Sequence, residues 1–119
     1  MATILVVDDN EDMLDLLSNF LGGKGHRVLT ASDAEDGLKK VREERPHLIL
    51  MDVMMPRMHG VEALRRVKAF DPSIKVIMIT AVDDREIAEE ALGSGATDYV
   101  SKPIDLQYLD TVVTFALFE

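Results

Sequence analysis

The sequence contains no cysteine and no tryptophan, and its aromatic residues are limited to two Tyr and four Phe. Without cysteine the chain can form no disulfide, no thiolate metal site and no cysteine nucleophile. Basic residues are also scarce, with 13 Lys and Arg against 22 Asp and Glu and a formal net charge of −9. Binding to nucleic-acid phosphates or to an anionic membrane surface depends on clustered Lys and Arg, so this balance argues against both.

Long hydrophobic runs are absent as well. The longest apolar segments, such as Ile4–Val7 and Leu48–Met51, are far too short to cross a bilayer. The start of the chain shows neither the basic region nor the cleavage-like site of a secretory signal. The 119 residues are fewer than a typical domain of about 150. We therefore expect a cytoplasmic protein that forms one domain over residues 1–119.

The negative charge is unevenly distributed along the chain. Residues 1–68 hold 10 basic and 12 acidic side chains (−2), whereas residues 69–119 hold 3 basic and 10 acidic side chains (−7). The second half is therefore expected to present an acidic surface.

Short apolar, β-branched segments alternate with segments of helical periodicity. Several of these segments are apolar throughout, as expected for central strands that are covered on both faces. Strands joined by helices through right-handed crossovers give an open parallel sheet with helices on both sides, so the fold class is α/β. The expected strands are residues 4–7, 27–31, 48–51, 75–79 and 99–101.

Helix starts are expected at polar side chains that can accept a hydrogen bond from the first turn. Ser32 and Glu35 have the spacing of a capping box, which predicts the start of the second helix. The other expected caps are Asn10, Asp83 and Asp105, for the first, fourth and last helices.

Chemically active side chains follow four of the five strands. Asp8 and Asp9 follow the first strand, Asp52 the third, Thr80 the fourth and Lys102 the fifth. In open parallel sheets ligands bind beyond the carboxyl ends of the strands, so these groups should meet at one edge. Taken singly, each could be only a helix cap or a turn residue. Their joint placement carries the prediction.

Crowded carboxylates require a compensating cation. Two of them about 4 Å apart repel by about 4 kcal/mol at an effective dielectric constant near 20. Oxygen ligands of this kind suit Mg²⁺. A carboxylate nucleophile beside Mg²⁺, a hydroxyl and an ammonium group is a suitable arrangement for phosphoryl transfer.

Four motifs extend this interpretation: Val7-Asp8-Asp9, the run from Asp52 to Gly60, Thr80-Ala81 and Ser101-Lys102-Pro103. In this order and at these spacings the chain resembles the receiver domain of two-component response regulators over essentially its whole length. The resemblance implies a flavodoxin-like (βα)5 sandwich of three layers whose parallel strands are ordered 2-1-3-4-5, as in flavodoxin and chemotaxis receivers.

The resemblance also implies a role for each site residue. Asp52 would accept a phosphoryl group from the phosphohistidine of a sensor histidine kinase or phosphotransfer protein. Asp9, Asp52 and the backbone carbonyl of Met54 would bind Mg²⁺ directly, with Mn²⁺ as a possible substitute, and Asp8 would bind it mostly through water. Such a domain catalyses its own phosphorylation and dephosphorylation and has no other substrate, so it is not an enzyme in the usual sense.

Further roles implied by the family concern the phosphoryl oxygens and the switch. Thr80 and the backbone N–H of Ala81 would bind phosphoryl oxygens, Lys102 would pair with another, and the Lys102-Pro103 peptide bond would be cis. Movement of Thr80 would let Tyr99 turn inward. That change would reshape the face made by the fourth helix, fifth strand and fifth helix, which would bind a downstream effector or a second copy.

Two departures from the family pattern lie close to the expected site. Met54 and Val82 are apolar at positions that control the hydrolytic water, so we expect a longer-lived acyl phosphate than in members with polar residues there. His59 replaces a residue that is often acidic, and little effect on the chemistry is expected from it.

The last helix combines an apolar stripe that can cover the sheet with aromatic residues on its other side. These residues are Tyr108, Phe115 and Phe118, and residues 105–119 contain no Lys or Arg. The aromatics could pack against neighbouring loops, belong to a helix that continues further, or form a partner surface. The lack of basic residues puts in doubt the salt-bridged dimer of the DNA-binding members.

Two rival functions remain at this stage. One is a degenerate receiver that acts as a phosphorylation-independent interaction module, against which the complete set of site residues argues. The other is a phosphohydrolase of the haloacid dehalogenase type, which carries its nucleophile and second acid as Asp-x-Asp on the first strand. Here Asp8 and Asp9 are adjacent and Asp52 follows the third strand.

Overall fold

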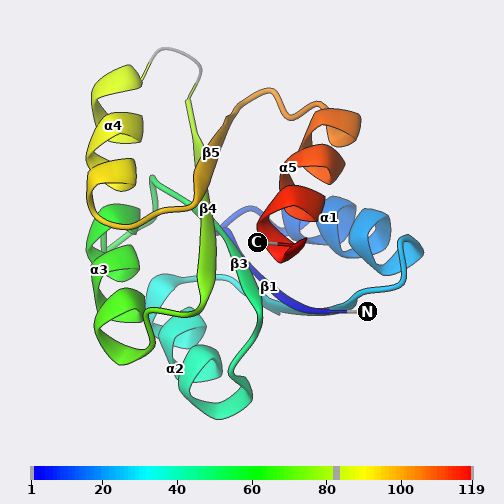
Figure 1. Ribbon diagram of the computed structural model, residues 1–119, viewed down its shortest axis with the longest axis horizontal. Helices are drawn as coiled ribbons and strands as arrows, with labels where there is room; N and C mark the ends of the chain where they lie inside the picture. The colour runs from blue at the N-terminus through cyan, green and yellow to red at the C-terminus, as the bar shows by residue number, and fades with distance from the viewer. Residues whose placement is uncertain (1, 82–83, 119) are drawn as a thin grey trace.

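The computed structural model describes residues 2–81 and 84–118, in which strands and helices alternate along the chain (Figure 1). The elements are β1 (Thr3–Val7), α1 (Glu11–Gly23), β2 (Arg27–Ala31), α2 (Ala34–Glu44), β3 (Leu48–Asp52), α3 (Gly60–Phe70), β4 (Lys75–Thr80), α4 (Arg85–Gly93), β5 (Asp98–Ser101) and α5 (Leu106–Phe118). All five expected strands are present, with ends that agree to within one residue.

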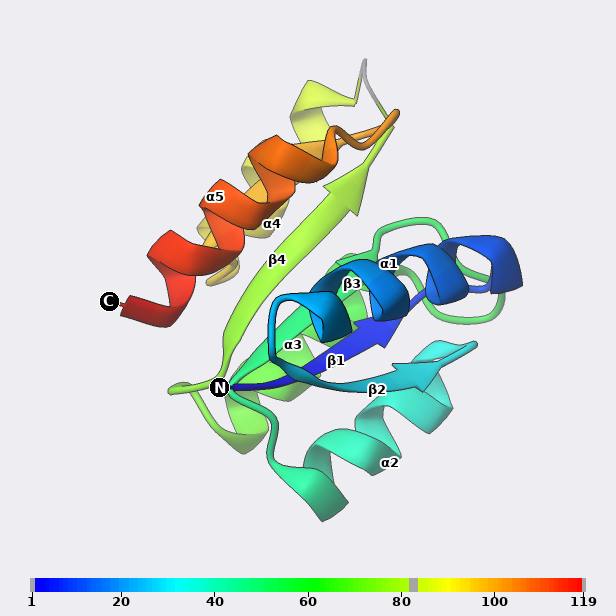
Figure 2. The same ribbon diagram turned by 90° about the vertical axis from the view of Figure 1, so that its right-hand side faces the viewer.

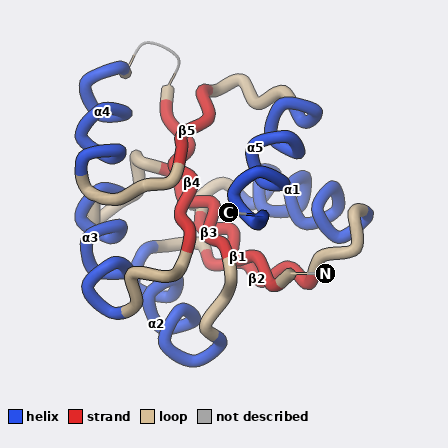
Figure 3. Tube along the Cα trace, viewed as in Figure 1, coloured by secondary structure: helices blue, strands red, loops and turns tan. Residues whose placement is uncertain are grey.

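The strands form one parallel sheet in the order β2-β1-β3-β4-β5, shown in red between the helices in Figure 3. In this register Val7, near the carboxyl end of β1, lies opposite Ala31 of β2 and Met51 of β3. The predicted flavodoxin-like α/β fold is confirmed. The sheet order brings the carboxyl ends of β1, β3 and β4 next to one another.

Helices cover both faces of the sheet, with α1 and α5 on one side and α2, α3 and α4 on the other (Figures 1 and 2). Strand β1 shows how a continuous apolar run serves both layers. Its residues Ile4 and Val6 belong to the core under α1 and α5, whereas Leu5 and Val7 belong to the core under the other three helices. The two cores explain why these strands do not alternate polar and apolar residues.

Two helix caps agree with the sequence prediction. Asn10 Oδ1 accepts a hydrogen bond from the Met13 amide (3.1 Å) at the start of α1. Asp105 Oδ1 accepts bonds from the amides of Gln107 (2.9 Å) and Tyr108 (3.2 Å) at the start of α5. These bonds satisfy amides that have no partner within the helix.

The cap predicted for the second helix is wrong by one residue. Asp33, not Ser32, caps α2, and its Oδ1 accepts a hydrogen bond from the Asp36 amide (2.8 Å). Both residue types are good caps, so the sequence alone does not separate the two registers. The cap predicted at Asp83 lies outside the described residues, and α4 begins at Arg85.

Among the described residues, no helix combines the length and the apolar character needed to cross a membrane.

Candidate functional site

The site lies at the carboxyl edge of the sheet, where the strand order places the predicted residues. Asp8 and Asp9 follow β1, Asp52 ends β3, Thr80 ends β4 and Lys102 follows β5. Each of the three carboxylates offers an oxygen that lies within 4.8 Å of the corresponding oxygens of the other two. The fold therefore gathers the acidic residues that are far apart in the sequence.

Asp8 is fully buried, and its two carboxylate oxygens differ in their surroundings. Oδ1 accepts a hydrogen bond from the Asn10 amide (2.9 Å), whereas Oδ2 has no hydrogen-bond partner among the described residues. Burial raises the pKa of Asp8 above its usual value, and the nearby charges of Asp52 and Asp9 add to this rise. The Asn10 bond and the Lys102 charge act in the opposite direction but do not cancel it.

Asp52 is almost completely buried, with 5% of its surface exposed. Its Oδ1 accepts a hydrogen bond from the Met54 amide (3.2 Å), and its Oδ2 pairs with Lys102 Nζ (3.2 Å). Lys102 is itself partly exposed. The carboxylate is thus oriented from two sides while the ammonium group that holds it remains accessible.

The loop after Asp52 is held by a backbone contact that only glycine permits. The Gly60 amide donates to the Val53 carbonyl (2.7 Å), and a Cβ atom at residue 60 would lie 2.6 Å from the Asp52 carbonyl oxygen and 2.7 Å from Val53 Cα. The Val53 amide also donates to the Ile79 carbonyl on β4 (3.0 Å). The start of α3 is therefore packed directly on the backbone of Asp52.

Sequence reasoning missed two further contacts of this loop. His59, from which little effect was expected, caps α3 through Nδ1, which accepts a hydrogen bond from the Val61 amide (3.2 Å). Arg57 pairs with Asp33, the cap of α2, at 3.6 Å. His is not among the usual cap residues and Arg57 is remote from Asp33 in sequence, so neither contact has a strong local signal.

Thr80 and Lys102 lie side by side on neighbouring strands. Thr80 is buried at the end of β4, Ala81 beside it is exposed, and the Lys102 amide donates to the Thr80 carbonyl (2.8 Å). The Lys102-Pro103 peptide bond is cis. The hydroxyl and the ammonium group thus belong to adjacent strand ends.

Tyr99 lies on the edge strand β5, where it is partly buried and packs against the core under α2, α3 and α4. It also lines a shallow groove of about 520 Å³ that runs along β5 to Tyr108 of α5. Met54 is exposed at the mouth of the acidic site, whereas Val82 lies outside the described residues. Tyr99 is therefore in contact both with the core and with an open surface.

The donor set is compatible with Mg²⁺. All the acidic groups offer oxygen, which this ion prefers, and three carboxylates face one ammonium group. The buried Oδ2 of Asp8 has no hydrogen-bond donor among the described residues, and a cation or a cation-bound water would supply its missing partner.

Comparison with known families agrees with the resemblance that the sequence motifs indicate. The sequence profile of the response regulator receiver domain matches residues 4–114. Transcriptional regulatory protein ZraR of Klebsiella oxytoca is 43% identical over 114 residues, which are 96% of this chain and 26% of that protein. Transcriptional regulatory protein AfsQ1 of Streptomyces coelicolor is 40% identical over 117 residues, or 98% of this chain and 52% of that protein. The chain thus spans about a quarter and about half of these two relatives.

Solved structures of similar chains have the same fold. A response regulator receiver domain protein from Clostridium thermocellum superposes with a TM-score of 0.95 at 32% identity, covering 99% of this chain and 95% of that one. The receiver domain of NtrX from Brucella abortus gives a TM-score of 0.93 at 34% identity, with 97% and 98% covered.

Proposed function

Because this chain belongs to the response regulator receiver domain family, we propose that it accepts a phosphoryl group on Asp52 from the phosphohistidine of a sensor histidine kinase or phosphotransfer protein. The observation that carries the proposal is the environment of Asp52. It is a buried carboxylate paired with Lys102 and placed beside two further carboxylates, one of which has an oxygen with no hydrogen-bond partner among the described residues.

In the proposed reaction a carboxylate oxygen of Asp52 attacks phosphorus while the phosphorus–nitrogen bond of the phosphohistidine breaks. The Met54 amide and Lys102 hold the carboxylate in place before attack. Lys102 then pairs with a phosphoryl oxygen, and the Thr80 hydroxyl and the Ala81 amide donate to the others. Conversion of the carboxylate to an acyl phosphate adds about one negative charge to the site, which these donors offset.

The metal is proposed to be Mg²⁺, which Mn²⁺ could replace. Asp9, Asp52 and the Met54 carbonyl would hold it, and Asp8 would contact it mostly through water. When bound, the ion neutralises carboxylate charge and polarises the phosphoryl oxygens. The raised pKa of Asp8 supports this proposal, because burial already makes the charged form of Asp8 unfavourable.

The proposed output is a change in the face formed by α4, β5 and α5. Movement of the Thr80 hydroxyl toward the phosphoryl group would leave space into which Tyr99 turns. Tyr99 is suited to this role because it lies on an edge strand between the core and the groove along β5. A downstream effector or a second copy of the chain would bind the altered face.

The direct test is incubation with acetyl phosphate and Mg²⁺ followed by intact mass measurement. A single phosphoryl adduct that is absent from Asp52→Asn supports the receiver function. Absence of an adduct from the unaltered chain would instead favour the phosphorylation-independent interaction module. Sustained phosphate release from many phosphate esters would favour a hydrolase.

A further inference from the structure

An open cavity of about 540 Å³ lies at the amino-terminal edge of the sheet, opposite the edge that holds Asp52. Among the residues that line it, His26 and His47 immediately precede β2 and β3, and Lys75 begins β4. Helix α5 runs back from the carboxyl edge and ends on this side, as Figure 2 shows, so that its last turns form part of the wall. A cavity of this size is within the range that small-molecule ligands occupy.

Two histidines bring hydrogen-bond donors to the cavity. His26 Nδ1 accepts a bond from the Ala2 amide (3.3 Å), and His47 Nδ1 accepts one from the Thr3 amide (3.0 Å). A neutral imidazole whose Nδ1 accepts a hydrogen bond carries its proton on Nε2. Within the described part of the chain, neither Nε2–H group has an acceptor. Both rings line the cavity, so a ligand that offers oxygen acceptors would supply the missing partners.

The Arg45 side chain is positioned at the cavity by the end of α3. Its guanidinium carbon lies 4.9 Å from the centroid of the Phe70 ring, and its Nη1 lies 3.5 Å from Asp71 Oδ2. One long contact of this kind leaves most of the five N–H donors of the guanidinium for another acceptor. Two parallel bonds from these donors match the two oxygens of a carboxylate.

Asp71 also lines the cavity, but its carboxylate is already bound within the chain. Its Oδ1 accepts bonds from the Ser73 hydroxyl (2.7 Å) and the Ser73 amide (3.0 Å). These bonds, together with the Arg45 charge, hold the pKa of Asp71 below its usual value. Arg45 and Lys75 therefore place two positive charges against one negative charge among the described lining residues, although the chain as a whole carries a net charge of −9.

The remaining wall of the cavity is largely apolar. Pro46 and Ile74 are buried beneath it, and Leu117 and Phe118 come from the last turn of α5. The Phe118 side chain is 86% exposed, so an apolar ligand group beside it would remove hydrophobic surface from water. The carbonyl ends of α2 and α5 add partial negative charge at this edge, which favours a singly charged anion over a doubly charged one.

We propose that this cavity binds a small molecule that combines one carboxylate with an apolar body such as a phenyl group. The carboxylate would pair with Arg45 and accept bonds from the Nε2–H groups of His26 and His47. The apolar body would pack against Leu117 and Phe118. This inference does not depend on the proposed phosphorylation, because the cavity shares no described residue with the acidic site.

The test titrates the full, unphosphorylated chain with phenylbutyrate and follows the backbone amide signals by two-dimensional NMR. We expect a Kd of about 0.1–1 mM, as for a small ligand with few atoms. The largest shifts should fall on amides that line the cavity, including those of His47, Ser73 and Thr114. Phenylbutyramide has the same apolar body without the charge and should bind at least about tenfold more weakly. Inorganic phosphate, which has no apolar body, should also bind more weakly than phenylbutyrate.

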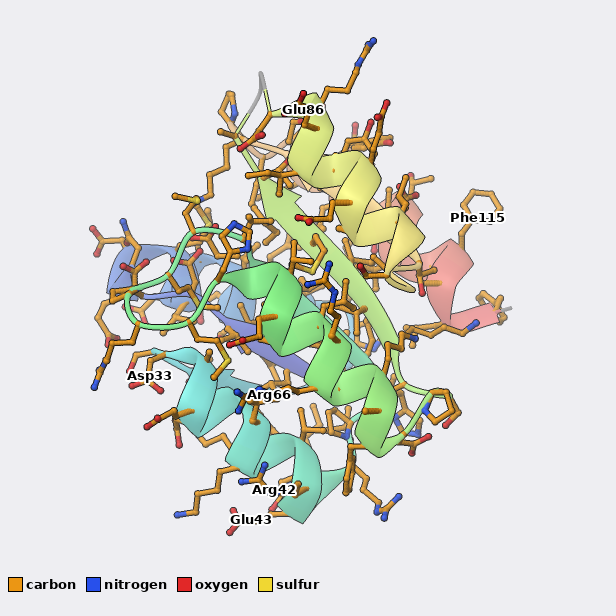
Figure 4. The ribbon with its side chains drawn as sticks, turned by 90° about the vertical axis from the view of Figure 1, so that its left-hand side faces the viewer. Asp33, Arg42, Glu43, Arg66, Glu86 and Phe115 are labelled. Atoms are coloured by element: carbon orange, nitrogen blue, oxygen red, sulfur yellow. The ribbon has the colours of Figure 1, made fainter. Side chains whose placement is uncertain are left out.

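Arg45→Gln removes the charge that pairs with the carboxylate and should weaken phenylbutyrate binding by about tenfold or more. Arg42→Gln is the matched control. Arg42 is exposed on α2, as Figure 4 shows, and does not line this cavity, so its replacement should leave binding unchanged. Phe118→Ser tests the apolar wall and should also weaken binding. The amide spectrum of each variant verifies that it is folded.

Four results would overturn the inference. They are no binding of phenylbutyrate, shifts that fall outside the cavity, equal binding of phenylbutyramide, and phenylbutyrate binding that Arg45→Gln does not weaken. Phosphate that binds as tightly as phenylbutyrate would likewise reject it and assign the cavity to a phosphate group. Because the titration uses the unphosphorylated chain, its failure leaves the result of the acetyl phosphate experiment unaffected.

Discussion

Replacement of Gly60 by alanine should disturb both the stability of the fold and the position of Asp52. The added Cβ would lie 2.6 Å from the Asp52 carbonyl oxygen, 2.7 Å from Val53 Cα and 3.0 Å from the Val53 carbonyl oxygen. All three are backbone atoms between the end of β3 and the start of α3, so no flexible side chain can move aside. Overpacking of this kind costs about 1–3 kcal/mol of unfolding free energy.

Gly93→Ala is the matched control for this experiment. Gly93 ends α4, and apart from its chain neighbours and its own helix backbone no described residue has a heavy atom within 4 Å of the position where its Cβ would stand. Alanine is a better helix former than glycine, so the change should be neutral or stabilising by up to about 1 kcal/mol. Urea unfolding measures both variants, and intact mass spectrometry measures how fast each forms a phosphoryl adduct with acetyl phosphate.

The expected outcome is a less stable Gly60→Ala protein that is also phosphorylated more slowly, since the backbone of the acceptor must shift. Gly93→Ala should match the unaltered chain in adduct formation. If Gly60→Ala unfolds at the same urea concentration and reacts at the same rate, the contact between α3 and the Asp52 backbone has no role in placing the acceptor.

Three further predictions concern the acidic site. Asp8→Asn should raise the unfolding free energy at neutral pH by about 1–3 kcal/mol, because it removes a buried charge whose Oδ2 has no hydrogen-bond partner among the described residues. Because the pKa of Asp8 is raised in the folded chain, ionisation of Asp8 destabilises the fold at pH values above its usual pKa. The stability gained by Asp8→Asn should therefore shrink as the pH falls toward 3.8. A difference in urea unfolding that does not change with pH would contradict this expectation. Lys102→Met removes the pairing with Asp52 and should lower the unfolding free energy, by only about 1 kcal/mol because Lys102 is partly exposed. It should also slow adduct formation. Unchanged urea unfolding and unchanged rates would count against the pairing with Asp52. The acyl phosphate, followed by mass spectrometry after removal of the phosphodonor, should persist well beyond seconds at neutral pH because Met54 offers no polar group to the attacking water, and decay within seconds would reject this reading.

Much of the fold follows from local sequence signals. The continuous apolar runs predict buried parallel strands, and the polar residues after those strands predict the edge at which Asp8, Asp52 and Lys102 meet. The prediction succeeds because strand ends in a parallel sheet share one edge whatever the lengths of the connecting helices.

The features that the sequence did not reveal depend on tertiary contacts, or on neighbouring residues that are about equally suited to the same role. Ser32 and Asp33 are both suitable caps, and the structure places Asp33 at the start of α2. The need for glycine at residue 60 arises from a backbone contact across a loop, and the amino-acid composition of the loop does not indicate this contact. Two further features likewise become evident only when the side chains are placed in space. They are the solvent exposure of Phe115 and the Asp8 oxygen that has no hydrogen-bond partner in the described part of the chain.

Asp52, rather than a neighbouring carboxylate, is proposed to carry the phosphoryl group. The phosphorylated chain is reduced with borohydride, which converts an aspartyl phosphate to homoserine, and its peptides are sequenced by mass spectrometry. Homoserine is expected at residue 52 and at no other aspartate. Homoserine at residue 8 or 9, or a phosphorylated chain that yields none, would contradict it.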